Sequence, residues 1–69
     1  MKPIGIRYAE IYHNGKTLNL EIEYYKTVAV VYIIDKSKYW EHVDTIRIKR
    51  GTTEVVLKAR EICIENGYF

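Results

Sequence analysis

Histidine, cysteine and carboxylate side chains are the groups of this chain with catalytic potential, but their spacing argues against catalysis. His42 lies between Glu41 and Asp44, and a catalytic histidine requires a carboxylate of this kind to orient it. In a strand, however, Glu41 projects from the opposite face, and Asp44 shares the face of His42 only two residues further along. Glu21 and Glu23 share one strand face, which is more typical of a solvated surface than of an acid/base pair.

No metal, cofactor or disulfide is expected. His13, His42 and Cys63 do not have the spacing of zinc ligands, and the chain contains no glycine-rich phosphate-binding motif and no nucleophile elbow. Cys63 is the single cysteine, which excludes an internal disulfide, and we expect it to be a small buried side chain. The sequence therefore predicts a protein that is not an enzyme.

The composition is that of one small folded domain, residues 1–69, with 48% hydrophobic and 29% charged residues and a net charge of +2. Lysine and glutamate are abundant and glutamine is absent, as in thermophile proteins. No run approaches the roughly 20 apolar residues of a membrane span, and the N-terminus lacks the apolar segment of a signal peptide. We therefore expect a cytoplasmic protein, in a host or infected cell, without a membrane partner.

A hairpin is the clearest structural signal. Asn14-Gly15 suits the two positive-φ positions of a type I′ turn, which joins strands predicted at 4–12 and 17–25 and pairs His13 with Lys16. In this register one face is mainly apolar and faces the core, with Ile11 opposite Leu18. The other face, called the outer face below, is a mosaic of tyrosine and glutamate. Its predicted members are Ile4, Ile6, Tyr8, Glu10, Tyr12, Thr17, Asn19, Glu21, Glu23 and Tyr25.

Two more strands are predicted after the hairpin. Residues 28–34 are apolar on both faces, as in a strand that is covered on both sides. The link Lys26-Thr27 carries no turn signal, so a single bent strand over 17–34 stays possible. A turn at 35–38 precedes a fourth strand at 42–49, with Ile46 and Ile48 inward.

The C-terminal segment predicts a helix over 53–66, capped by Thr52 and ended by Gly67. Its buried stripe would comprise Val55, Val56, Ala59, Ile62 and Cys63. The fold class is thus α+β, an antiparallel sheet of three or four strands with this helix on one face. The alternative is a small all-β barrel, because valine, isoleucine and threonine are frequent in 53–65.

The favoured ligand is single-stranded nucleic acid. Residues 36–50 hold five of the 11 basic residues, which suit phosphates, and two aromatic residues, which suit unpaired bases. This segment is expected on the side away from the acidic outer face. The predicted nucleic-acid site consists of Lys36, Lys38, Tyr39, Trp40, Arg47, Lys49 and Arg50.

Contact with a protein is the alternative, because tyrosine is enriched at protein interfaces. The chain would then be an inhibitor or adaptor of the kind that small viral genomes encode. A homodimer is expected in either case, because a chain this short has little core and neither disulfide nor metal to stabilise it. The predicted protein-interface residues are Tyr8, Tyr12 and Tyr25 on the sheet, and Leu57 and Ile64 on the helix.

Overall fold

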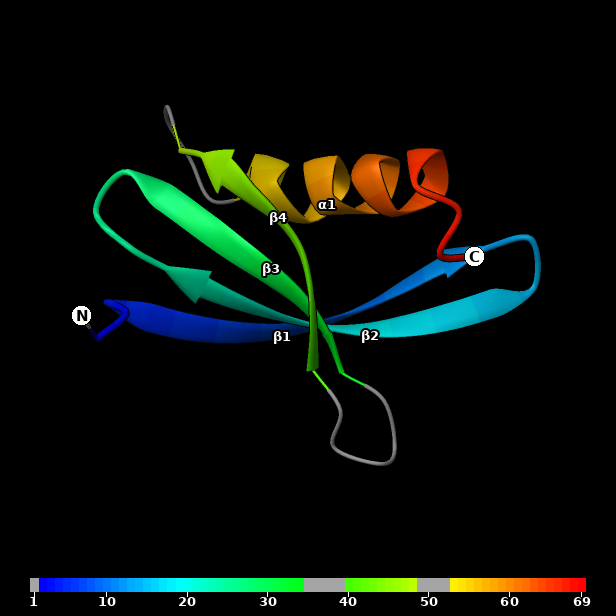
Figure 1. The fold of residues 1–69 in the computed structure, drawn as a ribbon, viewed down its shortest axis with the longest axis horizontal. Coiled ribbons are helices and arrows are strands. Elements are labelled where there is room, and N and C mark those ends of the chain that lie inside the picture. The colour runs from blue at the N-terminus through cyan, green and yellow to red at the C-terminus, as the bar shows by residue number, and fades with distance from the viewer. Residues whose placement is uncertain (1, 35–39, 49–52) are drawn as a thin grey trace.

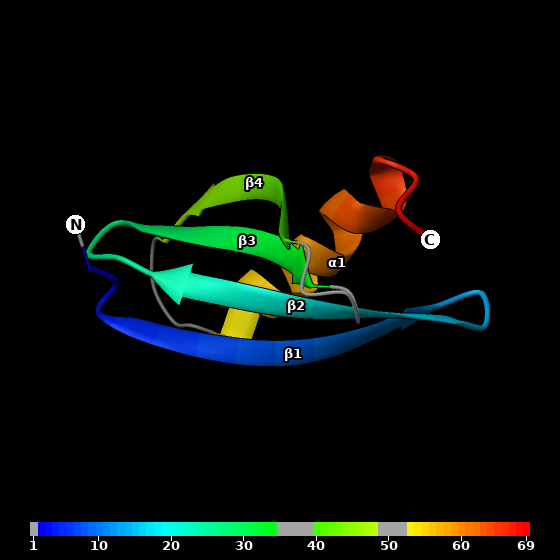
Figure 2. The ribbon, with the colours of Figure 1, turned by 60° about the horizontal axis from the view of Figure 1, so that its bottom comes forward.

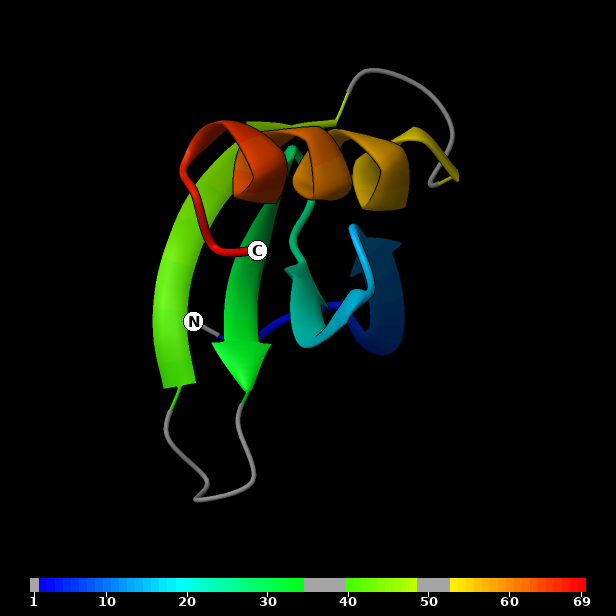
Figure 3. The ribbon, with the colours of Figure 1, turned by 90° about the vertical axis from the view of Figure 1, so that its right-hand side faces the viewer.

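The computed structural model describes residues 2–34, 40–48 and 53–69, with only the backbone of Trp40 and Thr53. Four strands form one antiparallel sheet in sequential order, and a helix lies across one side of it (Figures 1 and 3). The predicted α+β fold is confirmed, and the all-β barrel is wrong. The elements are β1 (Gly5–His13), β2 (Lys16–Tyr24), β3 (Val28–Ile34), β4 (Trp40–Arg47) and α1 (Thr53–Glu65).

The hairpin of β1 and β2 has the predicted register. Asn14 and Gly15 adopt φ angles of 51° and 78°, the positive values that a type I′ turn requires. His13 pairs with Lys16, and the ladder continues without a shift to Gly5 and Tyr24. Every strand residue of the hairpin therefore lies on the face that the sequence predicts.

A two-residue turn at Lys26-Thr27 separates β2 from β3. The Tyr25 amide donates to the Val28 carbonyl at 2.8 Å, and Glu21 pairs with Tyr32 in the antiparallel ladder that follows. Neither Lys26 nor Thr27 has a positive φ. The turn therefore requires no glycine or asparagine, which explains why the sequence does not mark it. A single bent strand over 17–34 is excluded.

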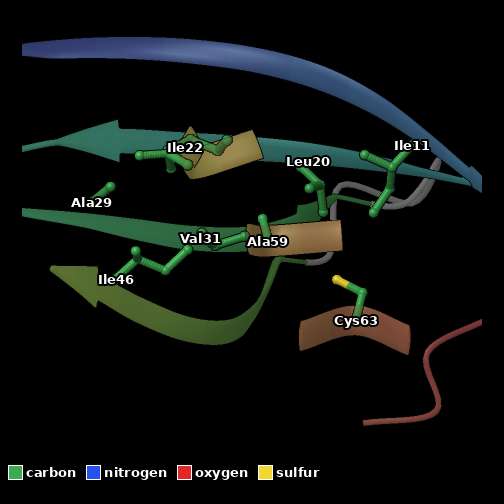
Figure 4. Packing of buried hydrophobic residues seen from close by; sticks show 9 residues of the cluster. Ile11, Leu20, Ile22, Ala29, Val31, Ile46, Ala59 and Cys63 are labelled. Carbon is green, nitrogen blue, oxygen red and sulfur yellow. The ribbon is translucent and has the colours of Figure 1, made fainter. Parts of the chain in front are cut away.

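The core lies between the sheet and α1 (Figure 4). The predicted helical stripe faces the sheet: Val55, Ala59 and Cys63 are buried, and Val56 and Ile62 pack at its margins. Burial raises the pKa of the Cys63 thiol, so this cysteine stays protonated and unreactive. The buried apolar residues are Ile11, Leu20, Ile22, Ala29, Val31, Ile46, Val55, Ala59 and Cys63.

The C-terminal end of α1 is closed by a Schellman motif. Gly67 has a φ of 76°, its amide donates to the Ile64 carbonyl at 3.2 Å, and the Tyr68 amide donates to Cys63 at 3.0 Å. This reversal returns the last residues to the hairpin, where the Phe69 ring meets the His13 ring at 5.3 Å. Gly67 thus has the predicted role, whereas the predicted cap Thr52 lies outside the described residues.

A β-bulge interrupts β4, which begins two residues before the predicted strand. Asp44 pairs with Val31 but His42 pairs with Tyr32, so Val43 has no partner across the ladder and packs against the core instead. The simple alternation that places His42 and Asp44 on one face does not hold across this bulge. The predicted turn at 35–38 lies outside the described residues.

Within the described part of the chain, no helix is long and apolar enough to cross a membrane, since α1 has 13 residues and carries several charges.

We expect Gly67→Ala to lower the free energy of unfolding by about 1 kcal/mol, because alanine resists a positive φ. Gly5→Ala is the matched control. A Cβ atom at either glycine meets nothing within 4 Å, so the two sites differ in backbone conformation and not in available space. Gly5→Ala should leave stability unchanged or slightly higher. Urea unfolding monitored by circular dichroism measures both, and equal effects would refute the strained-glycine explanation.

Candidate functional site

The outer face of the sheet is the candidate functional site. In the described part of the chain no helix or strand lies against it, since α1 occupies the other side (Figure 2). β3 contributes Val28, Val30, Tyr32 and Ile34 to this face, all partly exposed. The expectation that both faces of β3 are covered is therefore wrong for the described residues.

Large side chains are exposed along the β1 side of the outer face. Burial of apolar side chains stabilises a fold, but Ile4, Ile6, Tyr8 and Tyr12 remain mostly in solvent. They form a stripe along the edge of the sheet: Ile6, Tyr8 and Tyr12 project from the outer face of β1 with the exposed Glu10 between the two tyrosines, and Ile4 lies just before the strand. Their relative exposures are 74% for Ile4, 51% for Ile6, 67% for Tyr8 and 61% for Tyr12.

A row of four side chains crosses the middle of the outer face. Tyr8 pairs with Glu21, Glu21 with Tyr32, and Tyr32 with His42, one residue from each strand. The rings of Tyr32 and His42 lie edge to face with their centroids 5.7 Å apart. The row therefore places one carboxylate between two tyrosines, at the centre of an otherwise uncovered face.

Glu21 is the unusual member of this row, because it is only 2% exposed. The Tyr8 hydroxyl hydrogen-bonds to this carboxylate, which raises the pKa of Tyr8, and the negative charge of Glu21 raises it further. The other carboxylate oxygen, Oε2, is buried and makes no hydrogen bond among the described residues. Glu21 is thus not the solvated side chain that the sequence predicts.

Glu23 forms a second tyrosine–carboxylate contact on the same face. The Tyr25 hydroxyl donates to Glu23 Oε1 at 3.0 Å. This hydrogen bond, followed by partial desolvation, raises the pKa of Tyr25. Both pairs raise the pKa of a tyrosine hydroxyl, so the face offers neutral phenol groups in contact with glutamate side chains.

Most of the predicted nucleic-acid site falls outside the described residues: Lys36, Lys38, Tyr39, Lys49 and Arg50. Trp40 pairs with Ile34, and only its backbone is described. Arg47 is exposed and pairs with Val28, which places it on the outer face, on the edge strand opposite the one that carries Tyr8 and Tyr12. The expected separation between a basic side and an acidic face therefore does not hold for Arg47.

The predicted protein-interface residues do not form one surface. Tyr8, Tyr12 and Tyr25 belong to the outer face, as expected from the hairpin register. Leu57 is 65% exposed on α1, two residues from the buried Val55 and Ala59, so it points away from the sheet. Ile64 is partly buried on the same helix. The two helix residues and the three tyrosines lie on opposite sides of the molecule.

His42 has no catalytic arrangement among its described neighbours. Its Nε2 lies 3.4 Å from Thr45 Oγ1, while Asp44 accepts a hydrogen bond from the Thr45 amide at 2.7 Å. The described residues contain no group of three histidine, cysteine or carboxylate side chains suited to a metal ion.

Sequence reasoning missed Tyr32 and the burial of Glu21. A signal for the pairing was available: if Lys26-Thr27 is taken as a two-residue turn, Tyr25 pairs with Val28 and Glu21 with Tyr32. The burial of Glu21 had no sequence signal, because it depends on side chains from both neighbouring strands.

The sequence matches no family model and no curated protein, and the fold matches no solved structure at a significant level. The site therefore has to be interpreted from its own geometry.

Glu21→Gln should return the pKa of Tyr8 towards the ordinary tyrosine value of 10.0, because both largest causes of its increase come from Glu21. The pKa of Tyr25 is the internal control, since it depends mainly on Glu23. Ring resonances followed by NMR between pH 8 and pH 12 resolve the two tyrosines. An unchanged Tyr8 pKa in Glu21→Gln contradicts the hydrogen-bonded row.

Proposed function

We propose that the protein is a non-catalytic binding protein that docks another polypeptide on its outer face. The observation that supports this best is the exposed stripe of Ile4, Ile6, Tyr8 and Tyr12 on an uncovered sheet face. Tyrosine and isoleucine bodies supply apolar contact area, and tyrosine adds a polar tip at little cost in side-chain entropy. The protein would serve as an inhibitor or adaptor, in the cytoplasm.

The charges of the outer face favour a partner with a basic side chain. The described strand residues on this face include three acids, Glu10, Glu21 and Glu23, and one basic residue, Arg47. A buried carboxylate oxygen without a hydrogen bond is unfavourable, and a cationic donor from a partner would satisfy Oε2 of Glu21. Admitting that donor requires the largely exposed Tyr8 ring to swing outward and give up its hydrogen bond to Glu21, and the donor would then lie between Tyr8 and Tyr32.

A random heptapeptide display library, selected on the wild-type protein, tests this function. We expect selected peptides to carry arginine or lysine next to apolar residues. Tyr8→Ala should weaken their binding at least tenfold, about 1.4 kcal/mol, as expected for an exposed aromatic anchor. Calorimetric titration of synthetic copies of these peptides measures the effect.

Two controls accompany the titration. Leu57→Ala, on the far side of the molecule and with nearly the same exposure as Tyr8, should leave the affinity unchanged. Replacing arginine by citrulline in the peptide removes the charge but keeps the shape, so it should reduce the affinity for wild type more than for Glu21→Gln. Peptides that bind Tyr8→Ala as tightly as wild type contradict the proposal.

Single-stranded nucleic acid is the second candidate, supported by the placement of Arg47. This side chain is exposed on the same sheet face as the tyrosines and lines a shallow depression with Thr27, Val28 and Ile48. Basic and aromatic side chains on a sheet suit phosphates and bases. The glutamates on the same face repel phosphate, which is why we place this function second.

If nucleic acid is the ligand, Arg47→Ala should weaken oligonucleotide binding for all sequences alike. The slope of log affinity against log salt should become shallower by roughly one ion, because one phosphate contact is lost. Fluorescence anisotropy with a labelled oligothymidylate at several salt concentrations measures this, and Lys58→Ala on α1 is a control of equal charge change. Absence of binding at low salt eliminates this candidate.

A further inference from the structure

The open edge of β1 is the feature that carries an inference beyond docking on the outer face. β1 pairs with β2 alone, so its other side has no strand partner in the described sheet. It runs for nine residues without a proline or a bulge. Proteins usually protect such an edge, and the bulged β4 illustrates this at the other end of the sheet.

Hairpin geometry determines which backbone groups point out of this edge. The residues flanking a two-residue turn form a hydrogen-bonded pair, so His13 and alternate residues before it bond to β2. The hydrogen bond from Tyr25 to Val28 agrees with this pattern. It shows that the odd-numbered residues of β2 bond to β3, which leaves the even-numbered residues to bond to β1. The amides and carbonyls of Ile6, Tyr8, Glu10 and Tyr12 therefore point to the open edge.

One end of this edge is already occupied. Arg60 of α1 donates from Nε to the Tyr12 carbonyl at 3.0 Å. The backbone groups left open belong to Ile6, Tyr8 and Glu10, with Tyr8 in the middle. An added strand that uses these groups and leaves the Arg60 contact intact is centred on Tyr8.

We propose that the occupant of this edge is a second copy of the chain, whose β1 pairs antiparallel with the first about a two-fold axis at Tyr8. Identical strands related by a two-fold axis are antiparallel by symmetry. Tyr8 then faces Tyr8 of the other copy, and Ile6 faces Glu10. On the opposite face Arg7 meets Ala9.

Charge and side-chain shape favour this register over those with the axis at Glu10 or at Arg7. An axis at Glu10 opposes two glutamates, and an axis at Arg7 opposes two arginines, both of which are unfavourable. The axis at Tyr8 opposes no like charges and places two mostly exposed tyrosine rings side by side, where aromatic pairs gain from offset stacking. It also joins the two four-stranded sheets into one and brings the two exposed stripes together. The inference is independent of the proposed function, because it concerns the strand edge and not a foreign partner.

A disulfide trap tests the axis. Facing residues of a hydrogen-bonded antiparallel pair have Cα atoms about 5.5 Å apart, which suits a disulfide. Tyr8→Cys should therefore form a covalent dimer on mild oxidation. Tyr12→Cys changes the same residue type on the same face of β1. In the proposed dimer, however, the residues at position 12 of the two chains would lie about 27 Å apart, so they should not form a disulfide. We expect roughly tenfold more covalent dimer for Tyr8→Cys, because a disulfide does not bridge Cα atoms further than about 7 Å apart.

A proline substitution tests the edge without a new cysteine. The Glu10 amide points away from β2, so Glu10→Pro should keep the fold but remove a hydrogen bond to the second copy. Glu10→Ala is the matched control for the side chain. Sedimentation equilibrium should give wild type and Glu10→Ala about twice the 8.2 kDa chain mass, and Glu10→Pro the mass of one chain.

Several outcomes overturn the proposal. Wild type that sediments as a monomer at millimolar concentration excludes the dimer. Equal linking of Tyr8→Cys and Tyr12→Cys, or no linking of either, excludes the axis at Tyr8. A folded Glu10→Pro variant that stays dimeric excludes the β1 edge. Circular dichroism of each variant establishes that it is folded, and peptide binding plays no part in any of these measurements.

Discussion

The register imposed by the Asn14-Gly15 turn is the constraint on which the rest of the structure depends. Both residues adopt positive φ angles, so the turn pairs His13 with Lys16. This pairing determines the partner of every other residue in β1 and β2. A shift of one residue would move the apolar set to solvent and the tyrosines under α1. The core, the outer face and the direction of each backbone group at the β1 edge all follow from this single pairing.

The chain has one helix in its described part and a sheet with two faces, so half of the sheet surface is left uncovered. The side chains on that face combine apolar groups with polar ends, as in tyrosine. Tyr8 and Tyr25 bond to glutamates, and Glu21 lies between two rings. Such a face is stable in water, but burial of its exposed tyrosine and isoleucine side chains against another surface is favourable in free energy. A small domain with a limited core therefore retains a surface suited to association.

More of the fold than of the candidate site could be predicted from the sequence. The turn at Asn14-Gly15, the stripe of α1 and the glycine at its end each have a local chemical signal, and the structure has all three. The turn at Lys26-Thr27 has no such signal, because negative φ angles suit almost any residue. The bulge in β4 has none either, and it changes which neighbours His42 meets. Each of these two features affects the row that contains Glu21.

The sequence by itself determined the local geometry: which residues turn, which alternate across the hairpin and which side of α1 is apolar. These properties depend on the φ angles and spacing of residues close together in the chain. Only the tertiary structure decided that Glu21 is buried, that Arg47 shares the outer face with the tyrosines and that Leu57 lies on the far side of the molecule. Those properties depend on which strands lie side by side and which face the helix covers. They are therefore set by contacts between residues far apart in the sequence.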